Sequence, residues 1–248
     1  MPEKKKRTPD EIIEVLVVVM LGITALLTAW GSWIGSLHGG VQASSYTTSN
    51  NLASEGNSEY NAAVQKMNQD MILWNSISDM QLEITYYIDQ YDNDNIEKLC
   101  DQLYYKLQEN LSESMSEAIG WSKLTEEDHA DTKTAILTWM QMKEAYTSPF
   151  FDEEYCLSYF ETSNALLIQS QEVLKQGDEA NANGDAFGLV AVIYSVVLFL
   201  LGIAGSFKKL SSKYALLAIA LAAFIFATIY MITIPMPLDF SMSSFFGG

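Results

Sequence analysis

One histidine of this chain stands at a spacing that metal-binding helices use. His129 follows Glu126 by three residues in the stretch "EEDH", which is the Glu-x-x-His step of di-iron helical bundles. Such a centre needs two of these pairs and two further glutamates, and the other histidine, His38, stands in no such motif. Acidic residues at the start of a helix are also favoured by the helix dipole. We therefore expect no metal centre and no catalytic residue in this stretch.

A second group of acidic residues surrounds a predicted turn. Asp89, Asp92, Asp94 and Glu97 lie close together in the sequence, and carboxylate oxygens are the ligands that Ca²⁺ prefers. They are candidates for a divalent cation, but the glycine and the terminal glutamate of an EF-hand loop are missing. We favour a solvated acidic turn. The chain also shows no phosphate-binding loop and no nucleophile elbow, so we predict no enzymatic activity and no cofactor.

The chain contains two cysteines, Cys100 and Cys156. In a four-helix arrangement of the middle segment, they would lie at the same level on the second and fourth helices. A disulfide needs their Cα atoms within about 7 Å, and an oxidising compartment would allow one. Helices two and four of the simplest bundle are diagonal neighbours, which argues against contact. A Cys100–Cys156 disulfide and two free thiols both stay open.

Three long apolar runs set the architecture that must position these residues. Residues 12–34 contain one charge, Glu14, and residues 186–207 and 214–235 contain none. A helix needs about 20 apolar residues to cross a bilayer, and these runs leave no polar face to meet water. We predict an all-α membrane protein with transmembrane helices at 12–36, 186–207 and 214–235 that contact the lipid bilayer.

Basic residues gather at two places beside these runs, although the chain is acidic overall. One cluster precedes the first run and the other lies between the second and third. Short cytoplasmic loops carry such an excess of Lys and Arg, and both clusters reach the cytoplasmic side if the N-terminus is inside. The clusters are Lys4, Lys5, Lys6 and Arg7, and Lys208, Lys209 and Lys213.

This orientation divides the whole chain. Residues 37–185 hold seven Lys against 26 Asp and Glu, and we expect them outside the cytoplasm, where their acidity disfavours nucleic acid. The remaining parts are a cytoplasmic basic tail at 1–11, a cytoplasmic basic loop at 208–213 and an extracytoplasmic C-terminal tail at 236–248. A cleavable signal peptide is the alternative for the first run. That run is much longer than the usual apolar region of 7 to 15 residues, so we favour an uncleaved anchor.

The start of the first helix carries a capping signal. Thr8 is followed by Pro9 and, three residues after Thr8, by Glu11. This is a capping box with proline at the first helical position, where a missing N–H costs nothing. We therefore expect the helix to begin at Pro9.

Small residues spaced four apart occur in all three runs. Such pairs let membrane helices approach closely, either within one chain or between the copies of a homo-oligomer, and spacing alone does not choose between these roles. The pairs are Gly31 with Gly35, Gly202 with Ser206, and Ala218 with Ala222.

The middle segment shows helical periodicity without a strand pattern. Large residues from Tyr60 to Tyr91 recur at steps of three and four, with one gap at Gln81. Further helices are expected at 96–119, at 125–146 and from 152 to 184, and residues 44–51 could be a helical extension or a joint. The simplest packing is an extracytoplasmic antiparallel four-helix bundle.

The ends of the chain resemble an uncharacterised bacterial family of three-span membrane proteins with an extracytoplasmic helical insert. The stretch "LLTAWGSWIGSLHGGVQASSYTTSNNLA" is similar to the family's first span and its exit, and "ANANGDAFGLVAVIYSVVLFLLGIAGSFKK" is similar to its second span. Ala180, Asn181, Asp185 and Phe187 fill the characteristic positions of the second stretch, whereas Trp33 and Ile34 replace an aromatic-Gln pair. The resemblance implies three spans and an outer insert, and it implies no activity.

Three functional classes follow from these features. The first is a non-enzymatic membrane protein whose outer bundle acts as a sensor, scaffold or module that binds a membrane or envelope protein partner. The second is an oligomeric channel or transporter subunit, in which Thr24 and Thr228 would line a pore and the acidic outer segment would attract cations. The third is an enzyme, for which the sequence offers no residues. We favour the first.

Overall fold

The computed structural model describes residues 8–207 and 209–237, and all regular structure within them is helical. The predicted topology residues Lys4, Lys5, Lys6, Arg7 and Lys208 lie outside the described residues, as does most of the predicted tail at 236–248. The long helices are α1 (Pro9–Asp89), α2 (Asn93–Asn110), α6 (Glu161–Ala204) and α7 (Leu210–Thr233). The shorter α-helices are α3 (Glu113–Ala118), α4 (Thr132–Trp139) and α5 (Glu153–Ser158). The 3₁₀ helices are η1 (Trp121–Lys123), η2 (Asp128–Ala130), η3 (Glu144–Tyr146) and η4 (Pro149–Phe151).

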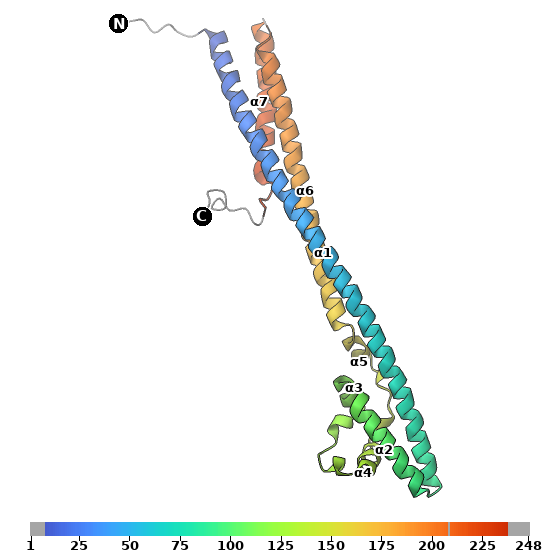
Figure 1. Cartoon of the computed structure of the whole chain (residues 1–248). Helices are drawn as coiled ribbons and strands as arrows, with labels where there is room; N and C mark the ends of the chain where they lie inside the picture. The colour runs from blue at the N-terminus through green and yellow to red at the C-terminus, as the bar shows by residue number, and fades with distance from the viewer. Residues whose placement is uncertain (1–7, 208, 238–248) are drawn as a thin grey trace. The chain divides into compact units, whose positions relative to one another are not determined.

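The chain divides into two compact units (Figure 1). One unit combines residues up to Asn51 with those from Ser170 onward, and we call it the spanning unit. The other comprises Leu52–Gln169, and we call it the insert unit. Both units take parts of α1 and α6, because each of these helices runs across a unit boundary. Residues 44–51 belong to α1, so the helical extension is the correct alternative there.

Helix α1 begins where its capping signal predicts. The Thr8 backbone N–H donates to Glu11 Oε2 at 2.9 Å, and the Glu11 N–H donates to Thr8 Oγ1 at 3.3 Å. These two bonds are the reciprocal pair of a capping box. Pro9 is the first helical residue, so the predicted start is confirmed.

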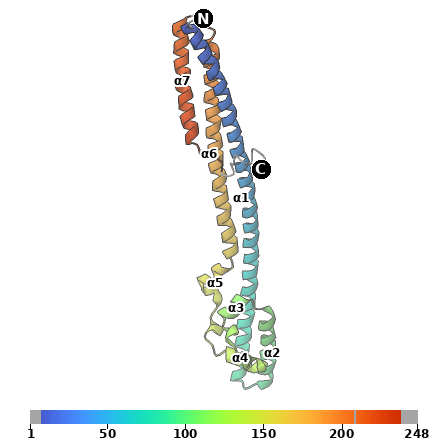
Figure 2. The ribbon, with the colours of Figure 1, turned by 90° about the vertical axis from the view of Figure 1, so that its left-hand side faces the viewer.

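Three helices are long and apolar enough to cross a membrane, namely α1, α6 and α7. They lie side by side in the spanning unit in both views of the chain (Figures 1 and 2). Two apolar clusters hold them together, one around Ile13, Leu201 and Leu217 and one around Phe187 and Tyr194. Many of the remaining apolar side chains point outward, as a helix bundle surrounded by lipid requires. The most exposed of these include Val18, Leu26, Phe199 and Ile232.

The helix predicted at 96–119 is interrupted. Helix α2 ends at Asn110, and Ser112 caps a separate helix α3 by accepting a hydrogen bond from the Met115 N–H at 3.3 Å. The predicted end at Gly120 is confirmed, because this glycine follows the last turn with φ +76°, a left-handed conformation that favours glycine. Its place in the fold is tight, since a Cβ there would lie 3.3 Å from Glu144 Cβ.

The helix predicted at 125–146 was wrong in length. Thr125 and Asp128 do form a reciprocal cap, but it opens only the short η2. The longer helix α4 begins after Asp131, whose carboxylate accepts from the Thr134 N–H at 2.8 Å. The chain then continues through η3, and the predicted break at Pro149 opens η4. Competing local caps therefore divide residues 125–151 into the short helices η2, α4, η3 and η4.

The last predicted helix also divides into two. Asp152 caps α5 through the N–H groups of Glu154 and Tyr155, at 2.9 and 3.2 Å. Helix α5 ends at Ser158 and α6 begins at Glu161. The insert unit is therefore helical, as predicted. It does not show a regular four-helix bundle, because short helices occupy residues 113–158.

The core of the insert unit is formed mainly by the end of α1, by α2 and by α4. Trp139 is fully buried, and its indole N–H donates to the Ile119 carbonyl at 2.8 Å. Gln81, the gap in the predicted apolar seam, is also buried and donates to the Ala145 carbonyl at 2.8 Å. The gap is thus a polar core position that ties an irregular segment to α1. It satisfies a carbonyl that would otherwise be buried without a partner.

Candidate functional site

The acidic residues considered for a cation do not form a binding cluster. Asp92 caps α2, and its carboxylate accepts from the Asn95 backbone and side chain at 3.2 and 2.7 Å. Asp89 is the last residue of α1, and Asp94 lies in the first turn of α2. Among residues 8–207 and 209–237, no three His, Cys, Asp or Glu side chains come together as metal ligands. The fourth candidate, Glu97, follows within α2.

Both cysteines are free thiols, so the disulfide alternative is wrong for this structure. Cys100 lies fully buried among the apolar side chains of the insert unit. Burial raises the pKa of its thiol to about 11. Cys156 is only partly buried, and its thiol contacts the Phe150 carbonyl oxygen at 3.5 Å.

The small-residue pairs have two different environments. Gly31 and Gly35 face α6, where a Cβ on Gly35 would lie 3.3 Å from Phe187 Cβ and 3.5 Å from the Gly184 carbonyl oxygen. The other two pairs do not pack the helices of one chain, because all four residues are exposed. They are Gly202 with Ser206, and Ala218 with Ala222. Instead, Ala220 and Ala227 are the small residues of α7 that are fully buried.

Lys213 forms the main polar contact of the spanning unit. Its side chain is only 7% exposed, and Nζ donates to Asp10 Oδ1 at 2.7 Å and lies 3.8 Å from Glu14 Oε1. The two carboxylates belong to the first turns of α1, and the lysine to the first turn of α7. This predicted topology residue therefore also joins two helices, a role that the sequence did not indicate.

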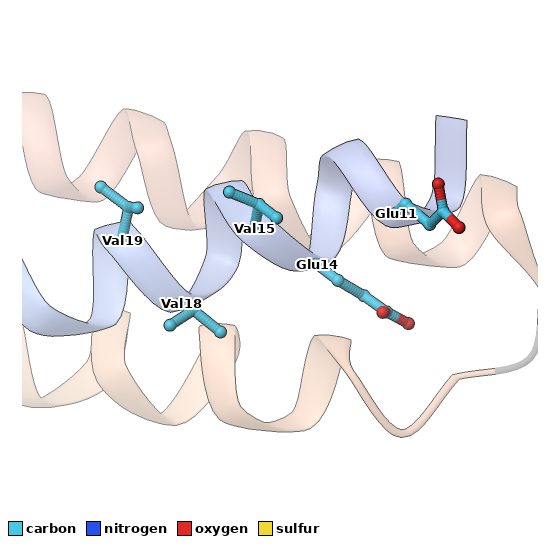
Figure 3. A pocket seen from close by; sticks show the side chains of 5 residues that line it. All are labelled: Glu11, Glu14, Val15, Val18 and Val19. Atoms are coloured by element: carbon cyan, nitrogen blue, oxygen red, sulfur yellow. The ribbon is translucent and has the colours of Figure 1, made fainter. Parts of the chain in front are cut away.

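Two grooves flank this ion pair. One, of about 330 Å³, is lined by Glu14 and Lys213 and by apolar residues that include Val17 and Ala204. The other is open and lies on one face of α1, where Glu11 and Glu14 project beside Val15, Val18 and Val19 (Figure 3). Each groove places charged groups next to an apolar surface, which is the chemistry of a lipid headgroup boundary.

His38 ties the opposite end of α7 to α1. The imidazole is buried, its Nε2 lies 3.1 Å from the Pro235 carbonyl oxygen, and its ring stacks on Phe187 at 5.7 Å between centroids. Lys213 thus joins the beginning of α7 to α1. His38 joins the residues just beyond the end of α7 to α1. His38 has a structural role here that its lack of a sequence motif left unassigned.

The threonines expected to line a pore face the interior of one chain. Thr24 is fully buried, and Thr228 shares a hydrogen bond of 2.9 Å with the buried Tyr194 hydroxyl. Thr228 also donates to the Phe224 carbonyl at 2.8 Å. Thr24 is thus enclosed within one chain and Thr228 is hydrogen-bonded within it, and the channel hypothesis stays a prediction that a single chain does not test.

The insert unit contains a buried carboxylate that the sequence analysis missed. Asp70 on α1 is 6% exposed. Its Oδ2 accepts from the Tyr159 hydroxyl at 2.6 Å and from Ser112 Oγ at 3.2 Å. The Tyr155 and Tyr159 hydroxyls lie 2.7 Å apart, so the network extends from α1 to α5 and the residue after it. Two donors on one oxygen stabilise the charged form of a carboxylate.

The tyrosines of this network remain donors at physiological pH. Burial is the main cause that raises the pKa of Tyr159, and its hydrogen bond to Asp70 raises it further. Burial likewise raises the pKa of Tyr155. Each protonated phenol supplies one O–H donor, and Tyr159 donates its own to Asp70.

Asp70 also lines an open pocket of about 450 Å³ between α1 and α2. Lys106 contributes a second charge, and its ammonium hydrogen-bonds to Ser76 Oγ. Leu73 and the exposed Ile72 supply an apolar wall, and Gln69 and Asn110 add two amide groups at the rim. A pocket of this size with a few polar groups is typical of sites for small molecules.

A signal for Asp70 was present in the sequence, but the predicted apolar seam ran through the neighbouring Met71, which is 39% exposed. Other positions of that seam, Trp74, Ile77 and Ile84, are buried as expected. The buried positions run through Ala63, Asp70, Trp74, Ile77, Gln81 and Ile84. On this seam, Asp70 and Gln81 are polar residues at core positions, which calls for a partner or a function.

Comparison with known proteins adds no relative to this description. The family resemblance at the ends of the chain therefore stays an expectation from sequence, and the two units are interpreted from their own chemistry. No protein family, curated protein or solved structure matches this chain.

Proposed function

We propose that this chain is a non-enzymatic, multi-pass protein of the cell membrane whose insert unit acts outside the cytoplasm as a sensor, scaffold or partner-binding module. The observation that carries the proposal is the pocket at Asp70, where a buried carboxylate and a lysine line one open cavity. The charge pattern assigns the acidic segment that holds this pocket to the extracytoplasmic side.

The proposed sidedness rests on the ends of the three spans. Lys209 and Lys213 lie at the start of α7, and Lys213 pairs with Asp10 at the start of α1. The beginnings of α1 and α7 therefore share one membrane face, the face to which the basic clusters assign the cytoplasm. The N-terminus is then cytoplasmic and the C-terminus extracytoplasmic.

We propose binding rather than catalysis because of the groups that line the pocket. Among its described lining residues, the ionisable groups are Asp70 and Lys106. A carboxylate fixed by two donors and a lysine form an arrangement that recognises charge.

We also propose a specific form for the extracytoplasmic domain. It is built on the end of α1 and on α2, with α4 packed against α2 and short helices completing the core. This replaces the regular four-helix bundle that the periodicity suggested. The exposed Phe151 and Tyr91 offer aromatic contacts to a membrane or envelope protein partner.

Sidedness is tested with two variants of the protein. One carries an epitope tag after Thr147, and the other carries it after Phe207. Both positions lie between helices, the first between η3 and η4 and the second between α6 and α7. We expect antibody to reach the first tag in intact cells and the second only after permeabilisation. The reverse pattern would overturn the proposal.

Partner binding is tested with a photo-crosslinking amino acid at Phe151, which is 91% exposed. We expect one dominant crosslinked protein of the membrane or envelope in intact cells. The matched control is the same crosslinker at Leu26, a side chain of the spanning unit that is exposed toward the expected lipid. An identical set of products from both positions would contradict a partner specific to the insert unit.

A further inference from the structure

We propose that the pocket lined by Asp70 and Lys106 binds a free α-amino acid with an uncharged side chain. This inference rests on the proposed function, because it names the ligand class of the same binding module. It is carried by the opposite charges and the apolar side chains that line this one pocket.

Asp70 provides the site for the ammonium group. Its two hydrogen bonds, from Tyr159 and Ser112, both end on Oδ2. Oδ1 makes no hydrogen bond within the described part of the chain, although Asp70 lines the pocket. One oxygen therefore holds the side chain in position, and the other is left to accept from a ligand. An ammonium is the group that best satisfies such an oxygen, because it brings both charge and donors.

Lys106 provides the site for the carboxylate. It is half-buried, and within residues 8–207 and 209–237 its ammonium pairs with no carboxylate. The hydrogen bond from Lys106 to Ser76 uses one of its three donors. A half-buried lysine with two remaining donors and no counter-charge is arranged to receive an anionic group.

The two charges of the pocket are not paired with each other. Ser112 contacts Asp70, and Lys106 contacts Ser76, so the segments 70–76 and 106–112 run antiparallel here. The ion pairs of the described residues do not include one between Asp70 and Lys106. Both groups line the same pocket, and a zwitterion offers a cation to the one and an anion to the other.

The rest of the pocket sets the preference among amino acids. Leu73 and Ile72 also line the pocket, and they offer apolar surface to a ligand side chain. A second negative charge on the ligand would approach Asp70, and a second positive charge would approach Lys106. Both would lose affinity through like-charge repulsion. An uncharged, preferably apolar side chain avoids both penalties.

Thermal unfolding of the full-length protein in detergent tests the proposal, because a ligand that binds the folded state raises the melting temperature. The probes are the proteinogenic amino acids, together with the N-acetyl and methyl ester forms of any that bind. We expect at least one uncharged amino acid to raise the melting temperature, and neither of its blocked forms to do so. The proposal fails if no free amino acid has an effect or if a blocked form binds equally well.

Variants assign the effect to this pocket. Asp70→Asn keeps an acceptor for Tyr159 but removes the charge, and Lys106→Met keeps the aliphatic stem, so each should lower the affinity at least tenfold. The matched controls, Asp79→Asn and Lys98→Met, change the same charges at exposed positions of α1 and α2 and should bind as the unaltered chain does. If Asp70→Asn does not fold, Lys106→Met decides the outcome, and unchanged binding in it overturns the proposal.

Thermal unfolding in the presence of calcium chloride distinguishes an amino acid site from a cation site. A Ca²⁺-induced stabilisation that Asp70→Asn removes, without any effect of amino acids, would replace the amino acid by a metal ion. Failure of the amino acid probes would leave the crosslinking result at Phe151 unaffected. The ligand class and the general binding role can therefore fail separately.

Discussion

Lys213 Nζ donates to Asp10 Oδ1 at 2.7 Å, which joins two residues that are 203 positions apart in the sequence. The lysine is buried, whereas the side chains of Asp10 and Glu14 are 55% and 63% exposed. One ammonium on α7 therefore faces two carboxylates on α1 at a single end of the spanning unit. An ion pair at the end of a membrane helix fixes both the partner and the register of that helix.

The first prediction concerns this contact. Lys213→Met should lower the melting temperature of the purified protein by at most a few degrees, because Asp10 and Glu14 would lose the cation that faces them but are more than half exposed to water. Lys209→Met, which removes a charge from an exposed position next to α7, should change it little. Adding Asp10→Asn to Lys213→Met should restore part of the loss. A double variant no more stable than Lys213→Met would show that the two side chains do not act as a pair.

The second prediction concerns the close approach of α1 and α6. Gly35→Leu should destabilise the spanning unit by about 1–3 kcal/mol, because even a Cβ at this position would lie 3.3 Å from Phe187 Cβ. Gly22→Leu is the matched control, since a Cβ there meets no atom within 4 Å. Equilibrium unfolding in detergent compares the two. Equal changes in stability would mean that the close contact of Gly35 with α6 does not set the effect.

The third prediction concerns the buried amide of the insert unit. Gln81→Leu should reduce the free energy of unfolding by about 1–3 kcal/mol, because the Ala145 carbonyl would lose its donor at 2.8 Å. Gln102→Leu removes an amide from an exposed position of α2 and should change stability by less than about 0.5 kcal/mol. Chemical denaturation monitored by tryptophan fluorescence would measure both. A Gln81→Leu protein as stable as the control would argue that the carbonyl is reached by water.

The fourth prediction concerns the two thiols. A thiol-reactive reagent should modify at most Cys156 in the folded protein at neutral pH, because Cys100 is buried and its pKa is raised from an ordinary value near 9 to about 11. Both thiols should react after unfolding without a reductant. If Cys156 stays blocked until a reductant is added, the cysteines are oxidised and the free-thiol description is wrong.

The raised pKa of Cys100 also makes stability depend on pH. Below about pH 9 the thiol is protonated in both states, and its burial stabilises the fold fully. As the pH rises toward 11 the unfolded chain loses this proton first, so up to about 3 kcal/mol of stability is lost. Other groups titrate in this range, so the measurement is the difference in pH dependence between the unaltered chain and Cys100→Ala. Equal slopes would show that the thiol does not contribute.

Local signals in the sequence predicted those parts of the fold that depend on a few neighbouring residues. The Thr8–Glu11 capping box formed as expected because both partners lie within one helical turn. The end of α3 before Gly120 was predicted for the same reason. The three apolar runs predicted the spanning helices, since length and composition alone determine that property.

The parts that failed depend on contacts between distant segments. The sequence could not show that the third predicted helix begins only after Asp131, or that the fourth breaks between Ser158 and Glu161, because equally good local signals compete there and packing decides among them. Asp70 was missed because Met71 made a plausible apolar seam, and only contact with Tyr159 reveals the true one. Lys213 was recognised as a topology signal, but its pairing with Asp10 requires knowledge of which helix ends lie together.

The separation of Asp10 from Lys213 has a consequence for biogenesis. The ribosome makes the first helix of the spanning unit, then the whole insert unit, and only afterwards the lysine that Asp10 contacts. At about 5–20 residues per second, this delay is roughly 10 to 40 s. Throughout that interval Asp10 and Glu14 are present without the cation that faces them in the finished fold. Arrival of α7 is therefore the event that completes this contact, and a chain that stalls before Lys213 would lack it.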